Sequence, residues 1–84
     1  MTARATRVNL PKSGMGIEEG TVARWLKTVG DRVHQGDVLV EVETAKAVQE
    51  VAAPTSGIVA EIFVKEGETI PVNTTLATIA EIDG

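Results

Sequence analysis

The chain has 84 residues, of which 43% are hydrophobic and 24% are charged. A chain of this length buries only about 60% of the surface that it exposes when unfolded, so we expect one domain over residues 1–84 without a deep catalytic cleft. Its net charge is −4 and its eight Lys and Arg residues are scattered, which argues against nucleic acid as a partner because phosphates require clustered positive charge. No apolar run is long enough for a transmembrane helix, so a membrane protein is not expected.

The sequence contains no cysteine and a single histidine, His34. Disulfides, thiolate nucleophiles and thiolate metal sites are therefore excluded, and one histidine cannot build a multi-histidine metal site. Any redox or acyl chemistry must be supplied by an attached group. Residues Met1–Arg7 lack the apolar segment of a secretory signal, and we expect a cytoplasmic protein whose partners are other proteins.

Short runs rich in Val and Ile, separated by Gly, Pro, Asn and Asp, predict strands and turns rather than helices. In chain order the predicted strands are Arg7–Leu10, Gly20–Leu26, Arg32–Val33, Val38–Thr44, Ala47–Val51, Gly57–Phe63, Thr69–Ile70 and Leu76–Ile82. Eight short strands are typical of a barrel or sandwich. We therefore expect an all-β flattened barrel of two four-stranded antiparallel sheets.

An internal repeat relates the two halves of the chain at an offset of 37 residues. Gly20-Thr-Val-Ala-Arg-Trp-Leu aligns with Gly57-Ile-Val-Ala-Glu-Ile-Phe, and Gly36 aligns with Asn73. Gly and Asn tolerate a left-handed backbone best, so the two turns are expected to share one geometry. Two copies of one unit can cover each other's hydrophobic faces about an approximate two-fold axis.

The chain reverses direction around Lys46. Two predicted strands are separated by Ala45 and Lys46 alone, and a hairpin with this two-residue loop would pair Thr44 with Ala47. The lysine ammonium would then project into water from a rigid base. Such a geometry is suited to an attachment point.

The same hairpin register places Glu41 opposite Glu50. Like charges directly across a strand pair are mildly unfavourable, so we expect either a bulge at this pair or side chains splayed toward solvent. With no pocket or second polar cluster beside them, the two carboxylates are read as a solvated face rather than as a general acid and base. No catalytic residue is predicted. Trp25 and Phe63 are expected to pack in the core, and His34 is expected to be exposed.

Six stretches of the sequence match one known family in order and spacing. They are Leu10-Pro-Lys-Ser-Gly-Met-Gly, Glu19-Gly-Thr-Val-Ala-Arg-Trp, Val29-Gly-Asp-Arg-Val-His-Gln-Gly-Asp, Glu41-Val-Glu-Thr-Ala-Lys-Ala, Glu50-Val and Ala53-Pro-Thr-Ser-Gly. With them, nearly the whole chain resembles the lipoyl domains of 2-oxoacid dehydrogenase complexes. The resemblance implies a non-catalytic carrier domain, part of an acyltransferase subunit of a 2-oxoacid or acetoin dehydrogenase complex, with lipoic acid amide-linked to Lys46.

The resemblance also implies the partners of the domain. A lipoate ligase or lipoyl transferase would modify Lys46. The lipoyl group would act as a swinging arm that accepts an acyl group from a thiamine-diphosphate-dependent decarboxylase, delivers it to coenzyme A at an acyltransferase domain, and is reoxidised by dihydrolipoyl dehydrogenase. The protein presents the group and the cofactor makes the bonds. In isolation the domain is expected to be monomeric.

Two sets of residues are expected to be recognised by the ligase and the partner enzymes. They are the flanks of the lysine, namely Glu43, Thr44, Ala45 and Ala47, and the surface-loop residues Gly14, Met15 and Ile17. Ala45 stands where the family commonly has an aspartate. Loss of that carboxylate is expected to affect partner recognition more than attachment of the cofactor.

Two alternative functions remain open. A biotin carrier domain of a biotin-dependent carboxylase would take biotin on the same lysine, although the resembled biotinyl carriers flank their lysine with methionines where this chain has Ala45 and Ala47. A structural adaptor of the same fold would leave Lys46 unmodified. The mass of the protein after co-expression with each ligase separates the three functions.

Overall fold

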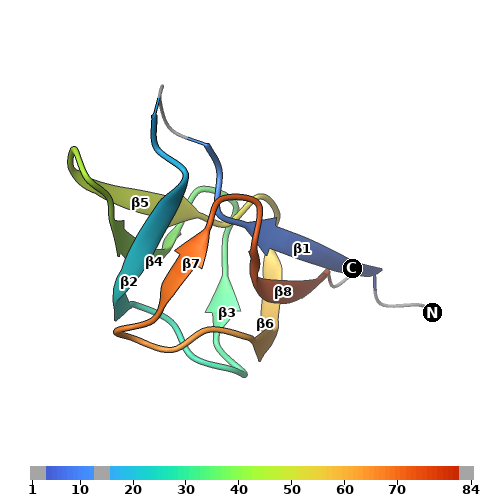
Figure 1. Ribbon diagram of the computed structural model, residues 1–84. Helices are drawn as coiled ribbons and strands as arrows, with labels where there is room; N and C mark the ends of the chain where they lie inside the picture. The colour runs from blue at the N-terminus through green and yellow to red at the C-terminus, as the bar shows by residue number, and fades with distance from the viewer. Residues whose placement is uncertain (1–3, 13–15, 82–84) are drawn as a thin grey trace.

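The structure, a computed structural model, describes residues 4–12 and 16–81, whose regular secondary structure is all strand (Figure 1). The strands are β1 (Arg4–Asn9), β2 (Glu19–Trp25), β3 (Arg32–Val33), β4 (Val38–Glu43), β5 (Val48–Ala52), β6 (Gly57–Ile62), β7 (Thr69–Pro71) and β8 (Thr75–Glu81). These residues include no helix long and apolar enough to cross a membrane. All eight predicted strands are present. The first begins at Arg4 rather than Arg7, because its pairing with β8 continues to Glu81.

The strands form two antiparallel sheets of four, in the orders β1-β8-β6-β3 and β5-β4-β2-β7. The predicted all-β flattened barrel of two four-stranded sheets is thereby confirmed. Each sheet contains strands from both halves of the sequence. Neither half can therefore complete a sheet without the other, as expected for two units related by an approximate two-fold axis.

The two halves also interlock through their backbones. The pairing register shifts after Val22 in β2 and after Val59 in β6, and such bulges leave backbone groups without a partner in the ladder. The turn of the opposite half supplies these partners: Gly67 N–H donates to Val22 C=O (2.7 Å) and Gly30 N–H donates to Val59 C=O (2.8 Å). Each half thus donates a hydrogen bond to the bulged strand of the other half.

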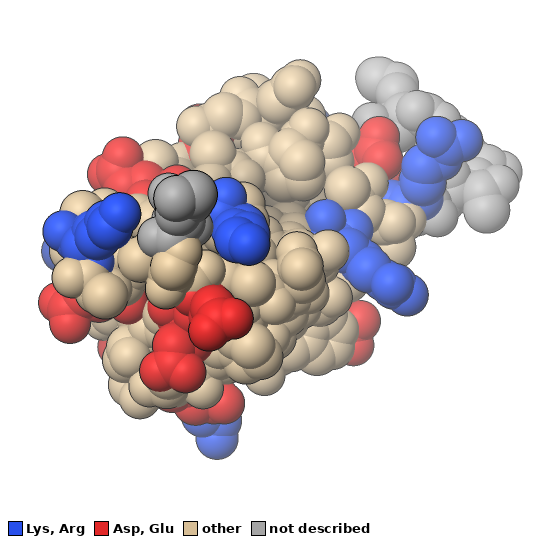
Figure 2. All heavy atoms as spheres, turned by 45° about the horizontal axis from the view of Figure 1, so that its top comes forward, with Lys and Arg blue, Asp and Glu red and all other residues tan. Residues whose placement is uncertain are grey.

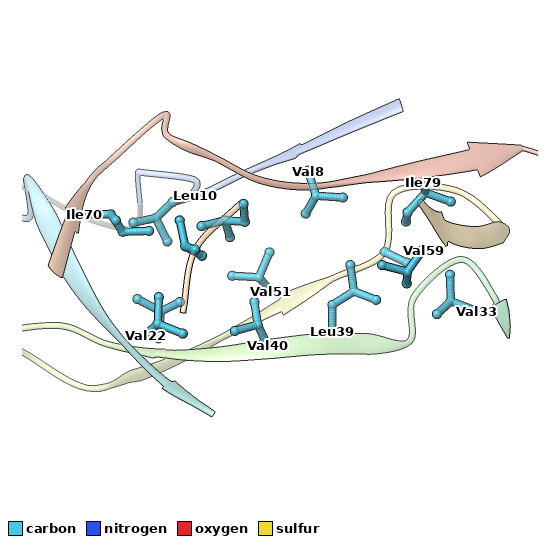
Figure 3. Close-up of a cluster of buried hydrophobic side chains, with 14 residues drawn as sticks. Val8, Leu10, Val22, Val33, Leu39, Val40, Val51, Val59, Ile70 and Ile79 are labelled. Atoms are coloured by element: carbon cyan, nitrogen blue, oxygen red, sulfur yellow. The ribbon is translucent and has the colours of Figure 1, made fainter. Parts of the chain in front are cut away.

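The core between the sheets is aliphatic. Its buried members are Val8, Leu10, Val22, Val33, Leu39, Val40, Val42, Val51, Ala53, Val59, Val64, Ile70, Leu76 and Ile79. Val8 on one side points toward Val40 and Val51 on the other (Figure 3). Within residues 4–12 and 16–81, no polar or charged residue is classed as buried. Close packing of branched aliphatic side chains therefore holds the two sheets together.

The two aromatic side chains, Trp25 and Phe63, differ in their burial. Trp25 packs against the edge of the core, and its indole N–H donates to the Val64 carbonyl (3.1 Å). Phe63 is 52% exposed, so the prediction that it packs in the core is wrong. Side chains alternate along an extended segment, and Val64 (5% exposed) occupies the inward position next to Phe63.

Candidate attachment site

The β4–β5 hairpin has the predicted register. Its pairs are Val40 with Val51, Glu41 with Glu50, Val42 with Gln49 and Glu43 with Val48, and the N–H of Thr44 donates to Ala47 C=O (2.9 Å). The register shift in this pair lies at the far end of the ladder, between Val38 and Val40. The two carboxylates are therefore directly opposite each other without a bulge, and the strand pair is regular up to the turn.

The turn at the tip is closed by a side chain. The Thr44 hydroxyl donates to Ala47 C=O (2.8 Å) and accepts from the N–H groups of Ala47 (3.3 Å) and Lys46 (3.4 Å). Two-residue hairpin loops usually use type I′ or II′ turns, which require a positive φ. Neither Ala45 nor Lys46 has one. The threonine therefore provides hydrogen bonds to a turn that is not of the usual hairpin type.

Lys46 lies at this tip and is exposed. Among the described residues, one contact between a basic and an acidic side chain lies within ion-pair distance, His34 Nδ1 to Asp37 Oδ2 (3.8 Å), and the Lys46 amine does not take part in it. The amine is thus held in solvent above a paired hairpin. This arrangement fits a group joined to the lysine by an amide bond, because nothing around the amine must be displaced.

A shallow groove of about 400 Å³ lies beside the hairpin. It is lined by Gly16–Thr21 on one side and by Glu43–Ala45 on the other. The structure therefore brings the described end of the surface loop, Gly16 and Ile17, beside the lysine flanks. Its carboxylates are those of Glu18, Glu19 and Glu43, and none of the described residues that line it is a Lys or an Arg.

The predicted recognition residues differ in their accessibility. Glu43, Ala45 and Ala47 are exposed, and Thr44 is half-buried. Ile17 is only 5% exposed, which corrects the expectation that it is a surface contact for a partner, because little of it can be reached. The two remaining predicted residues, Gly14 and Met15, lie outside the described residues.

The basic side chains are scattered on the face of the molecule that Figure 2 shows. Figure 2 shows a group of acidic side chains on the face turned to the viewer, with basic side chains separated from one another around it. In the part of the chain that the structure describes, no group of three or more His, Asp or Glu residues is arranged to hold a metal ion. His34 is 80% exposed, as predicted.

Two structural features of the hairpin were missed by the sequence analysis. At Gly20, an added Cβ would lie 2.5 Å from Val42 Cγ1 and 3.3 Å from the Glu43 carbonyl oxygen, so β2 approaches the lysine hairpin more closely than a side chain would allow. The alignment of Gly20 with Gly57 was the available signal, because a Cβ at Gly57 would also collide with the neighbouring strand. The second feature is Gln49, whose Oε1 is buried without a hydrogen-bond partner among the described residues.

A small all-β domain that presents an exposed lysine at the tip of a paired hairpin has the architecture of a carrier domain. A sequence profile of the biotin/lipoyl family, described as "Biotin-requiring enzyme", matches residues 6–79. The chain belongs to this family, and its likeness to the relatives and to the lipoyl-domain structure described next makes it a lipoyl carrier domain.

The chain is 40% identical over 77 residues to the dihydrolipoyllysine-residue succinyltransferase component of the 2-oxoglutarate dehydrogenase complex of Staphylococcus saprophyticus, covering 92% of this chain and 18% of that protein. It is also 40% identical over 74 residues to the dihydrolipoyllysine-residue acetyltransferase component of the acetoin cleaving system of Pseudomonas putida, covering 88% and 20%. The chain thus spans a fifth or less of the length of these two relatives.

Two solved structures show the same fold. The lipoyl domain of the Azotobacter vinelandii 2-oxoglutarate dehydrogenase complex superposes with a TM-score of 0.69 at 33% identity, covering 92% of this chain and 99% of that one. The Kluyveromyces lactis urea carboxylase superposes with a TM-score of 0.78 at 25% identity, covering 94% and 6%. The fold is therefore common to both kinds of protein, whereas the higher sequence identities favour the lipoyl domain over a biotin carrier.

Proposed function

We propose that Lys46 carries lipoic acid in amide linkage and that residues 1–84 form a single carrier domain. The observation that supports this most directly is the exposed Lys46 amine at the tip of a paired hairpin, outside any ion pair of the described residues. The two relatives are named as dihydrolipoyllysine-residue acyltransferase components, and a lysine that carries a lipoyl group agrees with this assignment.

The residues of the chain serve to bind and orient the attached group. The β4–β5 ladder fixes the base of the arm, and the Thr44 hydroxyl fixes the turn. When bound, the lipoyl group supplies the disulfide and dithiol chemistry that takes up and releases acyl groups and reducing equivalents. Because the domain holds this group on a tether, its concentration near a partner site is set by geometry rather than by free diffusion.

The proposed partners are a lipoate ligase or lipoyl transferase, a thiamine-diphosphate-dependent decarboxylase, an acyltransferase domain and dihydrolipoyl dehydrogenase. The relatives belong to 2-oxoglutarate and pyruvate dehydrogenase complexes and to acetoin cleaving systems. We place the domain in a complex of this kind in the cytoplasm. The isolated domain is proposed to be a monomer.

We propose that partners read the exposed flanks of the lysine together with the groove beside them. The exposed flanks are Glu43, Ala45 and Ala47, and Gly14 and Met15 are added on sequence grounds. Ile17 is assigned a packing role instead, because its side chain is buried. The carboxylates of the groove would attract basic side chains of a partner.

Intact-mass measurement tests the attachment. The chain is co-expressed with a lipoate ligase or, separately, with a biotin ligase. We expect the mass gain of one lipoyl group with the first enzyme and no gain with the second. The gain should disappear in Lys46→Gln and persist in Lys65→Gln, whose lysine is also exposed. A biotin adduct would support the carboxylase alternative, and absence of both adducts would favour an unmodified adaptor.

A further inference from the structure

We infer that the Thr44 hydroxyl is the positioning group of the lysine hairpin, which holds the turn in the conformation that a modifying enzyme accepts. This inference rests on the proposed function of Lys46. It assigns Thr44 a role inside the domain, in place of the direct contact with a partner that the sequence suggested.

The turn has little intrinsic preference for its own shape. Ala45 and Lys46 are residue types that favour helices rather than turns, and neither adopts the positive φ that usually defines a two-residue hairpin loop. The turn also lacks Gly, Asn and Asp, the residues that commonly stabilise such loops. A constraint from outside these two residues is therefore needed to keep the lysine in one place.

Thr44 supplies that constraint from both its backbone and its side chain. Its N–H and its hydroxyl both donate to the Ala47 carbonyl, at 2.9 and 2.8 Å. The hydroxyl oxygen also lies 3.4 Å from the Lys46 nitrogen, and the N–H of Lys46 donates to it. The backbone of Lys46 is thus tied directly to the Thr44 side chain, which fixes the point from which the lysine side chain extends.

Packing of the Thr44 methyl sets the direction of its hydroxyl. A Cβ placed at Gly20 would lie 3.6 Å from the Thr44 Cγ2 methyl, so this methyl lies beside β2, the strand that pairs with β4 in the same sheet. Threonine is branched at Cβ and has few χ1 rotamers. With its methyl directed toward Gly20, its hydroxyl is directed toward the turn.

The hydrogen bonds of the Thr44 hydroxyl have no counterpart at the equivalent position of the second half. The position equivalent to Thr44 in the second half is Glu81, which accepts a hydrogen bond from the Thr6 hydroxyl (2.7 Å) within the β1–β8 pair. Among the described residues, a threonine hydroxyl that bonds to a turn in this way is thus found at the lysine hairpin.

The test compares Thr44→Val, which keeps the branched shape but loses the hydroxyl, with Thr44→Ser, which keeps the hydroxyl but loses the methyl. Thr6→Val is the matched control, since it removes a hydroxyl hydrogen bond at the other end. The kinetics of lipoylation by a lipoate ligase are measured for each protein. We expect Thr44→Val to raise KM roughly fivefold at unchanged kcat, because a smaller fraction of molecules presents the lysine correctly.

Thr44→Ser and Thr6→Val should both keep KM within about twofold of the parent. Equal KM values for Thr44→Val and the parent would overturn the inference. Equal losses in Thr44→Val and Thr44→Ser would also overturn it, because Thr44→Ser keeps the hydroxyl and should therefore be protected. Acetylation of Lys46 by a small activated ester should not change in any variant, since the amine stays exposed.

Amide hydrogen exchange in the unmodified protein gives a readout that needs no ligase. We expect faster exchange at Lys46 and Ala47 in Thr44→Val, and unchanged exchange in the core strands. Unchanged exchange at the turn would contradict the inference. If the parent protein is not lipoylated at all, the proposed function fails, whereas the exchange experiment still decides whether the hydroxyl orders the turn.

Discussion

Gly36 and Asn73 occupy equivalent turns of the two halves, and both have a left-handed backbone, with φ values of 95° and 71°. The N–H of Gly36 donates to Ala53 C=O (2.9 Å), and the N–H of Asn73 donates to Leu10 C=O (2.7 Å). Each turn therefore ties down the residue that follows an edge strand. The shared geometry expected from the repeat is confirmed.

A left-handed conformation costs most L-residues roughly 1–2 kcal/mol, so substitutions at these turns should depend on residue type. We expect Asn73→Ala to lower the free energy of unfolding by about 1 kcal/mol and Asn73→Gly to leave it nearly unchanged. Urea unfolding followed by the fluorescence of Trp25 measures both. Equal stabilities for the Ala and Gly variants would contradict the assigned strain.

Gly57 and Gly20 should be intolerant of a side chain for steric reasons. A Cβ at Gly57 would collide with the backbone carbonyl of Ala80, whereas one at Gly20 would meet the side chain of Val42. We expect Gly20→Ala to lower the free energy of unfolding by roughly 1–3 kcal/mol, as overpacking does. Gly57→Ala should lower it more, because the backbone of Ala80 cannot rotate out of the way as the side chain of Val42 can.

Gly30→Ala provides the control for these two variants. Gly30 has a positive φ but nothing within 4 Å of an added Cβ, so its cost should be conformational alone, about 1 kcal/mol. The loss of unfolding free energy should therefore be smallest for Gly30→Ala, larger for Gly20→Ala and largest for Gly57→Ala. If Gly57→Ala were the mildest of the three, the close approach of β6 to β8 would be refuted.

Gln49 offers a site for stabilisation. Its Oε1 is buried without a partner among the residues that the structure describes, and an unsatisfied buried polar group costs roughly 1–3 kcal/mol. Gln49→Met has a similar shape without the orphaned oxygen and should raise the urea midpoint by an amount equivalent to about 1 kcal/mol. The exposed Gln35→Met should leave it unchanged. A loss of stability in Gln49→Met would mean that the amide oxygen does have a partner.

Ala45 should govern recognition more than folding. The residue is exposed at the edge of the groove, so Ala45→Asp should leave the unfolding free energy within about 0.5 kcal/mol of the parent. We expect it to change the rate of reductive acylation by the partner decarboxylase by up to about fivefold, the range of an exposed ion pair. Ala45→Asn, which is uncharged, is the control. If neither lipoylation nor acylation responds to Ala45→Asp, position 45 is not a discriminating contact.

Local patterns were sufficient to predict most of the fold and the place of the lysine. Strand positions follow from alternating apolar residues and turn residues, and the hairpin register follows from a loop of two residues, Ala45 and Lys46. The matched turns at Gly36 and Asn73 could be predicted because Gly and Asn have the same backbone tolerance. Each of these inferences uses residues that are close in the sequence or aligned by the repeat.

The features that were missed depend on contacts between distant segments. Whether Phe63 or Val64 faces the core depends on how the extended segment is oriented after the register shift in β6, which the sequence pattern does not specify. Ile17 was predicted to be a surface contact, but only 5% of it is exposed. The orphaned oxygen of Gln49 is visible only when the neighbouring strands are in place.

The ends of the first and last strands have a mechanical consequence. Arg4 pairs with Glu81 at the pole opposite the lysine hairpin (Figure 1), so polypeptides joined before β1 and after β8 would leave the domain side by side. A force that draws them apart would open the β1–β8 pair like a zipper, one rung after another, instead of shearing all its hydrogen bonds together. The β4–β5 hairpin lies outside that line of force and should keep its lysine in place while the far pole yields.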